Sequence, residues 1–438
     1  MMTVVNHPKG FTLTLAHDLI TRYRQNRPIS LDVSWEDDLI FPAYDGFSIA
    51  NLAQTIGTRL GVDYPTPLHP MLGIPDNVDR VVLYITDGLG YLRLQYLIEH
   101  DPEVAEWVHH LTDGRGAIPL TSTTPSTTVA ALNTLWTGAT PAQHGVMGTV
   151  LFLPEVAMMC DILYFKPKMG NLPNGILESW GIDPTHFTGV PTLAQRLAQN
   201  GVPTHICGLY TLVGSGLSRM LHTGVEHITP NLGFDDMWGQ FRNLLHQTRG
   251  QKTYVSMYNH NIDQLSHFYH AISPQTSAEI KHQLLRLHQI VTDPEIADGR
   301  TLFLCVADHG HQDAPNFIRF NAPENFAFYD TFRMFFGGDV RFSYLYLRDG
   351  QRENAIQLSK QLFGDNIALI PSATALESGL FGTGDHHPEA RHRIGDLIAI
   401  PRPTYRCADI PRPEDKVHSL HAGLSAWEML VPLLWKVI

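Results

Sequence analysis

The sequence has few cysteines, a deficit of basic residues and no long apolar segment. Its 31 lysines and arginines are outnumbered by 43 aspartates and glutamates, so the formal charge is -12 and we expect no nucleic-acid polymer as a partner. A small phosphorylated substrate is compatible, because bound metal ions supply local positive charge. No uncharged stretch is long enough to span a bilayer, and charged residues interrupt residues 1–31, so we expect neither a membrane span nor a signal peptide. The 4 cysteines lack zinc-type spacing, which favours reduced thiols and a cytoplasmic protein.

Apolar runs typical of buried strands alternate with amphipathic stretches along most of the chain. Runs bounded by Gly, Pro or polar residues predict strands at residues 79–86, 204–207, 252–258 and 301–307. Helical spacing predicts helices at residues 48–56, 91–99, 128–136, 190–198 and 276–291. This alternation indicates an α/β fold with a largely parallel central sheet covered by helices on both faces.

The pattern changes after residue 311. Residues 340–348 alternate between apolar and polar types like a half-buried strand, and they are followed by a predicted helix at 351–362 and strands at 366–370 and 393–400. We therefore expect a small α+β insertion or cap. We expect four parts along the chain: an N-terminal arm packed on the core (residues 1–75), the first part of the core (76–311), the insertion (312–392) and the last part of the core (393–438).

Three predicted strands end in residues that can bind a metal ion. Asp87 follows the first strand, Asp263 and His267 follow the third, and the pair Asp308-His309 follows the fourth. Ligands of open α/β sheets bind at the carboxyl ends of the strands, and residues four apart share one face of a helical turn. A turn or a polar helix start explains each feature alone. Together they favour a zinc site, with manganese as the alternative.

A hydroxyl group lies between the first two of these strand ends. Thr128 stands at the expected start of a helix, where free backbone N–H groups and the helix dipole favour an anion. An ordinary helix cap is the alternative explanation, and the adjacent Thr127 is the alternative nucleophile.

The chain has 24 histidines, so position must select those with a chemical role. His418 and His421 precede an apolar stretch for which we expect a C-terminal helix. His311 and the pair His386-His387 lie in or beside the expected insertion, and we set them aside for that reason.

In chain order, the motifs are an Asp-Gly strand end, a Pro-x-x-Thr turn, a Thr-Gly-Ala-Thr-Pro segment leading to His-Gly, an Asp-x-x-x-His element, an Ala-Asp-His-Gly element and a late histidine. This ordered set resembles the alkaline phosphatase superfamily and, within it, the type I phosphodiesterase and nucleotide pyrophosphatase branch. The resemblance covers about residues 76–311 and 393–438. It implies an alkaline-phosphatase-like three-layer sandwich with a small insertion.

The resemblance also implies a role for each matching residue. Thr128 looks like the nucleophile. Two divalent metal ions, zinc being favoured over manganese, would be held by two sets of side chains: Asp263, His267 and His421 for one, and Asp87, Asp308, His309 and Thr128 for the other. Such a site would hydrolyse a phosphodiester or nucleotide pyrophosphate through a covalent phospho- or nucleotidyl-threonine.

Other functions are compatible with the same residues. A phosphomonoesterase, phosphonate hydrolase or phosphomutase of the same superfamily would use this constellation on a different substrate. A non-catalytic metal-binding protein with this fold is the alternative from another class. The Cys/Ser-x-Pro-x-Arg context of sulfatases is missing around Thr128, which argues against a sulfatase.

Overall fold

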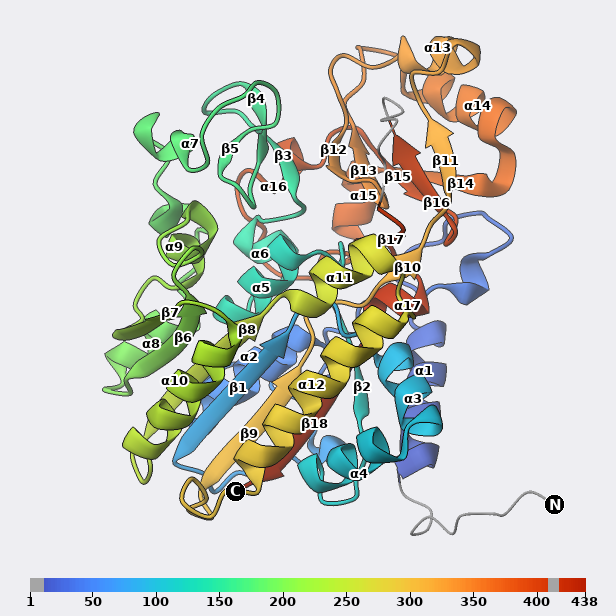
Figure 1. Ribbon diagram of the computed structural model, residues 1–438. Helices are drawn as coiled ribbons and strands as arrows, with labels where there is room; N and C mark the ends of the chain where they lie inside the picture. The colour runs from blue at the N-terminus through green and yellow to red at the C-terminus, as the bar shows by residue number, and fades with distance from the viewer. Residues whose placement is uncertain (1–11, 409–416) are drawn as a thin grey trace, which may run out of the picture.

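The computed structural model describes residues 12–408 and 417–438 and contains two large β-sheets, one in the body of the molecule and one above it in Figure 1. Residues 1–11 of the expected N-terminal arm and residues 409–416 of the last core segment lie outside the described part of the chain.

The central sheet has seven strands in the order β2-β18-β9-β1-β8-β6-β7. Their bounds are β1 Arg80–Thr86, β2 Ile118–Thr121, β6 Thr204–Leu209, β7 His227–Asn231, β8 Thr253–Asn259, β9 Thr301–Val306 and β18 Leu430–Val437. Strands β9, β1, β8, β6 and β7 are parallel, whereas β18 runs antiparallel to both β2 and β9. The predicted α/β fold with a largely parallel central sheet is therefore confirmed.

Helices cover both faces of this sheet and give the molecule three layers (Figure 1). On one face, Tyr84 of β1 stacks on Trp238 with ring centroids 5.2 Å apart and donates a hydrogen bond to Gln283 (2.7 Å). On the opposite face, Tyr254 of β8 contacts the ring of Trp136. The first face carries α3 Tyr91–His100, α4 Pro102–Leu111, α10 Phe234–Gln247 and α12 Pro274–Val291, and the second carries α2 Ile49–Arg59, α5 Thr128–Thr137 and α8 Leu193–Gln199, with α1 Thr12–Gln25 beside β2.

The parallel register places three strand ends at one edge of the central sheet. Thr86 of β1 lies opposite Asn259 of β8, and Ile85 lies opposite Val306 of β9. All seven residues of β1 and all six of β9 are buried, as expected for strands covered on both faces. The residues that follow β1, β8 and β9 therefore meet at the same edge, beneath helix α11 (Asn261–Tyr269) in Figure 1.

The second sheet combines strands from three separate parts of the chain. Its order is β14-β15-β13-β12-β3-β4-β5, with bounds β3 Val150–Leu153, β4 Met158–Asp161, β5 Lys166–Pro167, β12 Gly337–Asp339, β13 Phe342–Leu345, β14 Ile367–Pro371 and β15 Leu397–Pro401. Residues 312–392, the expected insertion, do not form this layer alone. Their strands β12 and β13 pair with β3 and β15, and both of these partner strands lie outside that range. Strand pairing, and not continuity of the chain, determines the layer.

A small apolar cluster includes Ala355 and Phe363 of α14 (Arg352–Phe363) and is separate from the main core. It includes Phe320, Phe328 and Phe332 from residues 312–392, and also Leu397 and Ala399 from β15.

The predicted strand at 393–400 begins four residues later than expected, because Ala390–Arg393 forms the short helix α16.

The predicted C-terminal helix is wrong. Only the short helix α17 (Ala426–Met429) precedes β18, which inserts between β2 and β9. A fully buried strand and a buried helix both require a continuous apolar run, so periodicity alone does not distinguish them. The unpaired edges of β2 and β9 supply backbone partners that only a strand can use.

All 4 cysteines are buried thiols. Within residues 12–408 and 417–438, no helix combines the length and apolar character that crossing a membrane requires.

Candidate active site

The first cluster joins the ends of β1 and β9 to the start of α5. The Nε2 atom of His309 lies 3.0 Å from Oγ1 of Thr128, 3.2 Å from Oδ1 of Asp87 and 3.4 Å from Oδ2 of Asp308. His309, Asp87 and Asp308 are all buried. A hydroxyl, an imidazole and two carboxylates thus converge on one point.

His309, Asp308 and Asp87 each have one polar side-chain atom occupied by the protein and another directed at the shared point. His309 Nδ1 donates to the carbonyl of Gly310 (3.0 Å), which leaves its Nε2 lone pair available. Asp308 Oδ1 accepts from the backbone N–H groups of Gly88 and His309 (3.1 and 2.9 Å). Tyr258 donates to Asp87 Oδ2. The remaining oxygens, Asp87 Oδ1 and Asp308 Oδ2, are buried without a hydrogen-bond donor, and a divalent cation fits this set.

The electrostatics of this cluster also fit a cation. Burial raises the pKa of Asp87 well above its usual value, and the neighbouring carboxylates of Asp308 and Asp263 raise it further. Burial likewise raises the pKa of Asp308. Two buried carboxylates side by side repel each other, and a divalent ion between them would reverse that effect.

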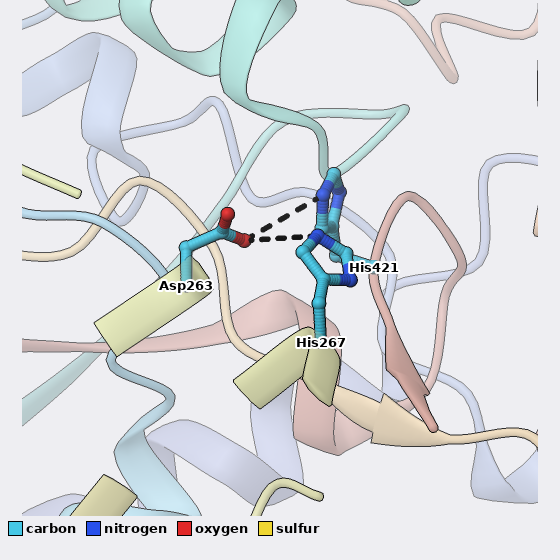
Figure 2. Close-up of side chains that lie close together, drawn as sticks. All are labelled: Asp263, His267 and His421. Atoms are coloured by element: carbon cyan, nitrogen blue, oxygen red, sulfur yellow. Dashed lines mark ion pairs between the residues drawn. The ribbon is translucent and has the colours of Figure 1, made fainter. Parts of the chain in front are cut away.

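The second cluster consists of Asp263 and His267 from α11 and His421 from the C-terminal segment (Figure 2). Oδ1 of Asp263 lies 3.4 Å from Nε2 of His267 and 3.7 Å from Nε2 of His421. His267 Nδ1 donates to the carbonyl of Ser419 (2.8 Å), so its Nε2 is again available. Burial acts to raise the pKa of Asp263, but the surrounding imidazoles outweigh it and hold that pKa well below its usual value.

Long-range backbone contacts position the C-terminal histidine. Ala422 N–H donates to the carbonyl of Ser126 (2.8 Å), and Ser126 Oγ donates to the carbonyl of Gly423 (2.7 Å). His421 is thereby held beside the turn that precedes α5, with its ring stacked 3.9 Å from that of His309. His421, and not His418, lies in this cluster.

His311, which its place in the sequence did not single out, lies against the second cluster. Its ring is buried, and Nε2 lies 2.8 Å from Oδ1 of Asp263. Burial lowers the pKa of His311 to about 3. Its ligand atom also lies within 4.8 Å of those of Asp263 and His309. The only signal in the sequence was its spacing, two residues after His309.

The other histidines that were set aside stay away from the site. Neither His386 nor His387 belongs to a metal-binding group among the residues that the structure describes. His387 packs instead against Gly145 and Gly189. A further group of His246, Asp293 and Glu295 lies on the surface, where Arg242 already pairs with both acids.

The two candidate hydroxyls differ in their surroundings. Thr128 is partly exposed at the start of α5, where backbone N–H groups are free. Thr127 is fully buried, and its hydroxyl lies 3.1 Å from that of Thr149. Only the Thr128 hydroxyl therefore combines access with contact to the first cluster.

A cavity of about 970 Å³ opens beside Thr128. One wall is the face of α5 that carries Thr128, Leu132 and Trp136, spaced four residues apart. Leu163 and Tyr164 contribute to another wall. Lysine and arginine are missing from the described residues that line the cavity, so it suits the organic group of a substrate.

The chain has the fold of the alkaline phosphatase superfamily. Murine ectonucleotide pyrophosphatase/phosphodiesterase 5 is similar over 81% of this chain and 87% of its own, with a TM-score of 0.59 and 13% identity. An inactive threonine-to-alanine variant of that protein, in complex with AMP, gives a TM-score of 0.58 at the same identity and coverage. Phosphonoacetate hydrolase from Sinorhizobium meliloti, in complex with phosphonoformate, is similar over 82% of this chain and 90% of its own, with a TM-score of 0.55 and 15% identity.

The sequence matches the type I phosphodiesterase / nucleotide pyrophosphatase family over residues 81–422, more than three quarters of the chain, and the protein belongs to this family. It is therefore a hydrolase of the phosphodiesterase and pyrophosphatase type. A comparison with curated protein sequences gives no match.

Proposed function

We propose that this protein hydrolyses phosphodiester or nucleotide pyrophosphate bonds through a covalent intermediate on Thr128. The observation that carries this proposal is the position of the Thr128 hydroxyl, 3.0 Å from His309 Nε2, beside two buried carboxylates and open to a cavity. A hydroxyl in such a setting can be converted to an alkoxide near neutral pH.

The proposal includes two divalent metal ions, with zinc favoured and manganese as the alternative. Two sets of side chains would hold them: Asp87, Asp308, His309 and Thr128 in one, and Asp263, His267 and His421 in the other. When bound, such ions lower the pKa of a coordinated hydroxyl or water and offset charge on the phosphoryl oxygens.

In the proposed first step, Thr128 Oγ1 loses its proton to solvent and attacks phosphorus. The bond between phosphorus and the leaving oxygen breaks, and the alcohol or phosphate departs, taking up a proton from solvent. The N–H groups in the first turn of α5, which have no acceptor within the helix, would stabilise negative charge on the phosphoryl oxygens. In the second step, water attacks the same phosphorus, and the bond between phosphorus and Thr128 Oγ1 breaks. The hydroxyl of Thr128 is thereby restored.

The cavity supports a small phosphorylated substrate that carries an organic group. Leu132 and Trp136 offer it an apolar wall one and two helical turns from Thr128. One organic group, as in a phosphomonoester, would also fit this space, so we favour the diester on the family match. Because one similar structure is a phosphonoacetate hydrolase, a phosphonate is the substrate class to compare.

The test compares hydrolysis of bis-p-nitrophenyl phosphate, p-nitrophenyl phosphate, an aryl phosphonate and ATP, with zinc or manganese added after removal of bound metal. We expect the diester or ATP to be preferred, and metal removal to abolish turnover. A hundredfold preference for the monoester would contradict the diesterase proposal. Two bound metal ions without turnover of any ester would favour the non-catalytic metal-binding protein.

Matched variants identify the nucleophile. Thr128→Ala should abolish turnover, because no hydroxyl then lies beside His309. Thr127→Val removes the adjacent hydroxyl with little change in volume and should retain most activity. If Thr128→Ala kept wild-type turnover and Thr127→Val lost it, the nucleophile would be Thr127.

A cytoplasmic location also remains part of the proposal. The buried thiol form of all 4 cysteines supports it, since reducing compartments keep thiols in that form.

A further inference from the structure

We propose that His311 is a positioning residue that orients the carboxylate of Asp263 for metal binding. This inference rests on the proposed function, in which Asp263 holds one of the two metal ions. It concerns a residue of this chain that lies outside both proposed metal-binding sets.

The contact between the two side chains has the geometry of a hydrogen bond. Nε2 of His311 lies 2.8 Å from Oδ1 of Asp263, whereas the nitrogens of His267 and His421 lie farther from the same oxygen, at 3.4 and 3.7 Å. A carboxylate oxygen has two lone pairs, so Oδ1 can accept a hydrogen bond from His311 and still bind a metal ion.

The position of His311 favours a hydrogen-bond donor to Asp263. It argues against His311 as a third imidazole ligand of the ion held by Asp263, His267 and His421. Asp263, His267 and His421 form one compact set of ligand atoms without it. His311 groups instead with Asp263 and His309, which the proposed function assigns to two different ions. With the ring proton on Nε2, His311 donates to the shared carboxylate, and its buried Nδ1 makes no hydrogen bond within the described residues.

The fold holds the His311 ring tightly in this place. His311 is 1% exposed, and its ring makes an edge contact with the ring of His267 at 4.9 Å. Gly88 forms the opposite side of the slot: a Cβ atom there would lie 3.0 Å from His311 Cδ2 and 2.9 Å from Asp263 Cα. The ring has little freedom to turn away from Asp263.

Hydrogen bonds of this kind fix the orientation of a metal-binding side chain, and their loss typically lowers metal affinity by about 10–100-fold. Without the donor, the Asp263 carboxylate can rotate about its side-chain bonds. The effect should be confined to the ion held by Asp263, because Asp87 and Asp308 have other partners, the Tyr258 hydroxyl and backbone N–H groups.

Three substitutions separate hydrogen bonding from packing. His311→Gln places an amide N–H near the position of Nε2 and keeps the donor. His311→Asn has the same amide on a shorter chain, near the position of Nδ1, where it does not reach Asp263. His311→Met fills a similar volume without a donor.

The measurement is the affinity of the full-length protein for Zn²⁺, by competition with a chromophoric chelator, together with the visible absorption spectrum after Co²⁺ loading. We expect two ions in the wild type. His311→Met and His311→Asn should weaken one of them by about 10–100-fold and leave the other unchanged, while His311→Gln should stay close to the wild type. Circular dichroism and the urea midpoint of the metal-free proteins check that each variant folds.

The alternatives give different results. Unchanged affinities for folded His311→Met would show that the residue only fills space. If His311→Gln were as weak as His311→Met, and its Co²⁺ spectrum indicated a lost nitrogen ligand, His311 would be a ligand and not a positioning residue. A wild type that binds no metal would overturn the proposed function as well. If the His311 variants bound metal like the wild type and Thr128→Ala were inactive, only the role of His311 would fail, and the proposed function would stand.

Discussion

Replacing Glu428 by alanine is expected to destabilise the protein and to loosen the site from a distance. Arg341, just before β13, makes a bidentate ion pair with Glu428 of α17, with Nε–Oε1 and Nη2–Oε2 distances of 2.9 and 2.7 Å. Both side chains are almost completely buried, at 1% and 0% exposure. This pair connects the second sheet to the C-terminal segment that carries His421.

The size of the effect follows from what the substitution leaves unpaired. Arg341 would keep only its bonds to the carbonyls of Arg402 and Tyr405, with Nε and Nη2 buried and unpaired. Gly423 N–H and the Ser425 hydroxyl would lose their acceptor as well. Removing one partner of a buried pair costs about 3–5 kcal/mol, which is a large part of the roughly 5–15 kcal/mol available to a folded domain. Because Gly423 lies two residues after His421, metal affinity should also fall.

The assay is urea unfolding monitored by circular dichroism, in excess chelator so that metal binding does not contribute to the free energy of unfolding. The double variant Arg341→Met/Glu428→Leu is the control. It removes both charges, so it should be less destabilised than Glu428→Ala alone. A loss below about 1 kcal/mol for Glu428→Ala, or a double variant no more stable than Glu428→Ala, would refute the reasoning.

Two further predictions concern buried groups in and near the site. Burial, with the nearby charges of His387 and Arg393, lowers the pKa of His144 to about 3, so the unfolded chain takes up a proton first as the pH falls below about 6.5. The contribution of His144 to stability is therefore present above pH 6.5 and is lost towards pH 3, by up to about 1.4 kcal/mol per pH unit. In urea unfolding between pH 6.5 and 5, the free energy of unfolding of His144→Gln should fall less steeply with pH than that of the wild type. Equal pH dependence of the two proteins would contradict this. Gly88→Ala should cost roughly 1–3 kcal/mol, because Gly88 has φ +77° and a Cβ there would lie 2.9 Å from Asp263 Cα. It should also weaken Zn²⁺ binding in the same chelator competition, and wild-type stability with wild-type affinity would show that the backbone at Gly88 has room to adjust.

The strand-end part of the site could be predicted from the sequence because it depends on local features and one general rule. Asp87 and Asp308 each follow an apolar run that forms a strand of the parallel sheet. The register that pairs Thr86 with Asn259, and Ile85 with Val306, then brings the three strand ends together. Asp263 and His267 needed only the helical spacing of four residues, which α11 provides.

Other features could not be predicted, because they depend on which distant segments meet. The apolar run at 430–437 suits a buried helix as well as a buried strand, and the open edges of β2 and β9 make it a strand. Residues 312–392 resembled a separate insertion, yet their strands pair with residues 150–153 and 397–401 in one sheet.

The sequence by itself determined the class of fold, the edge of the sheet at which the polar residues gather, and the family to which the chain belongs. These follow from apolar periodicity and from the order of short motifs, which are local properties of the chain. The tertiary structure alone decided that His311 faces Asp263, that Thr128 and not Thr127 opens to the cavity, and that Glu428 and Arg341 anchor the segment of His421. Those relations depend on side-chain direction and close packing between segments far apart in the chain, and neither quantity is encoded in residue spacing.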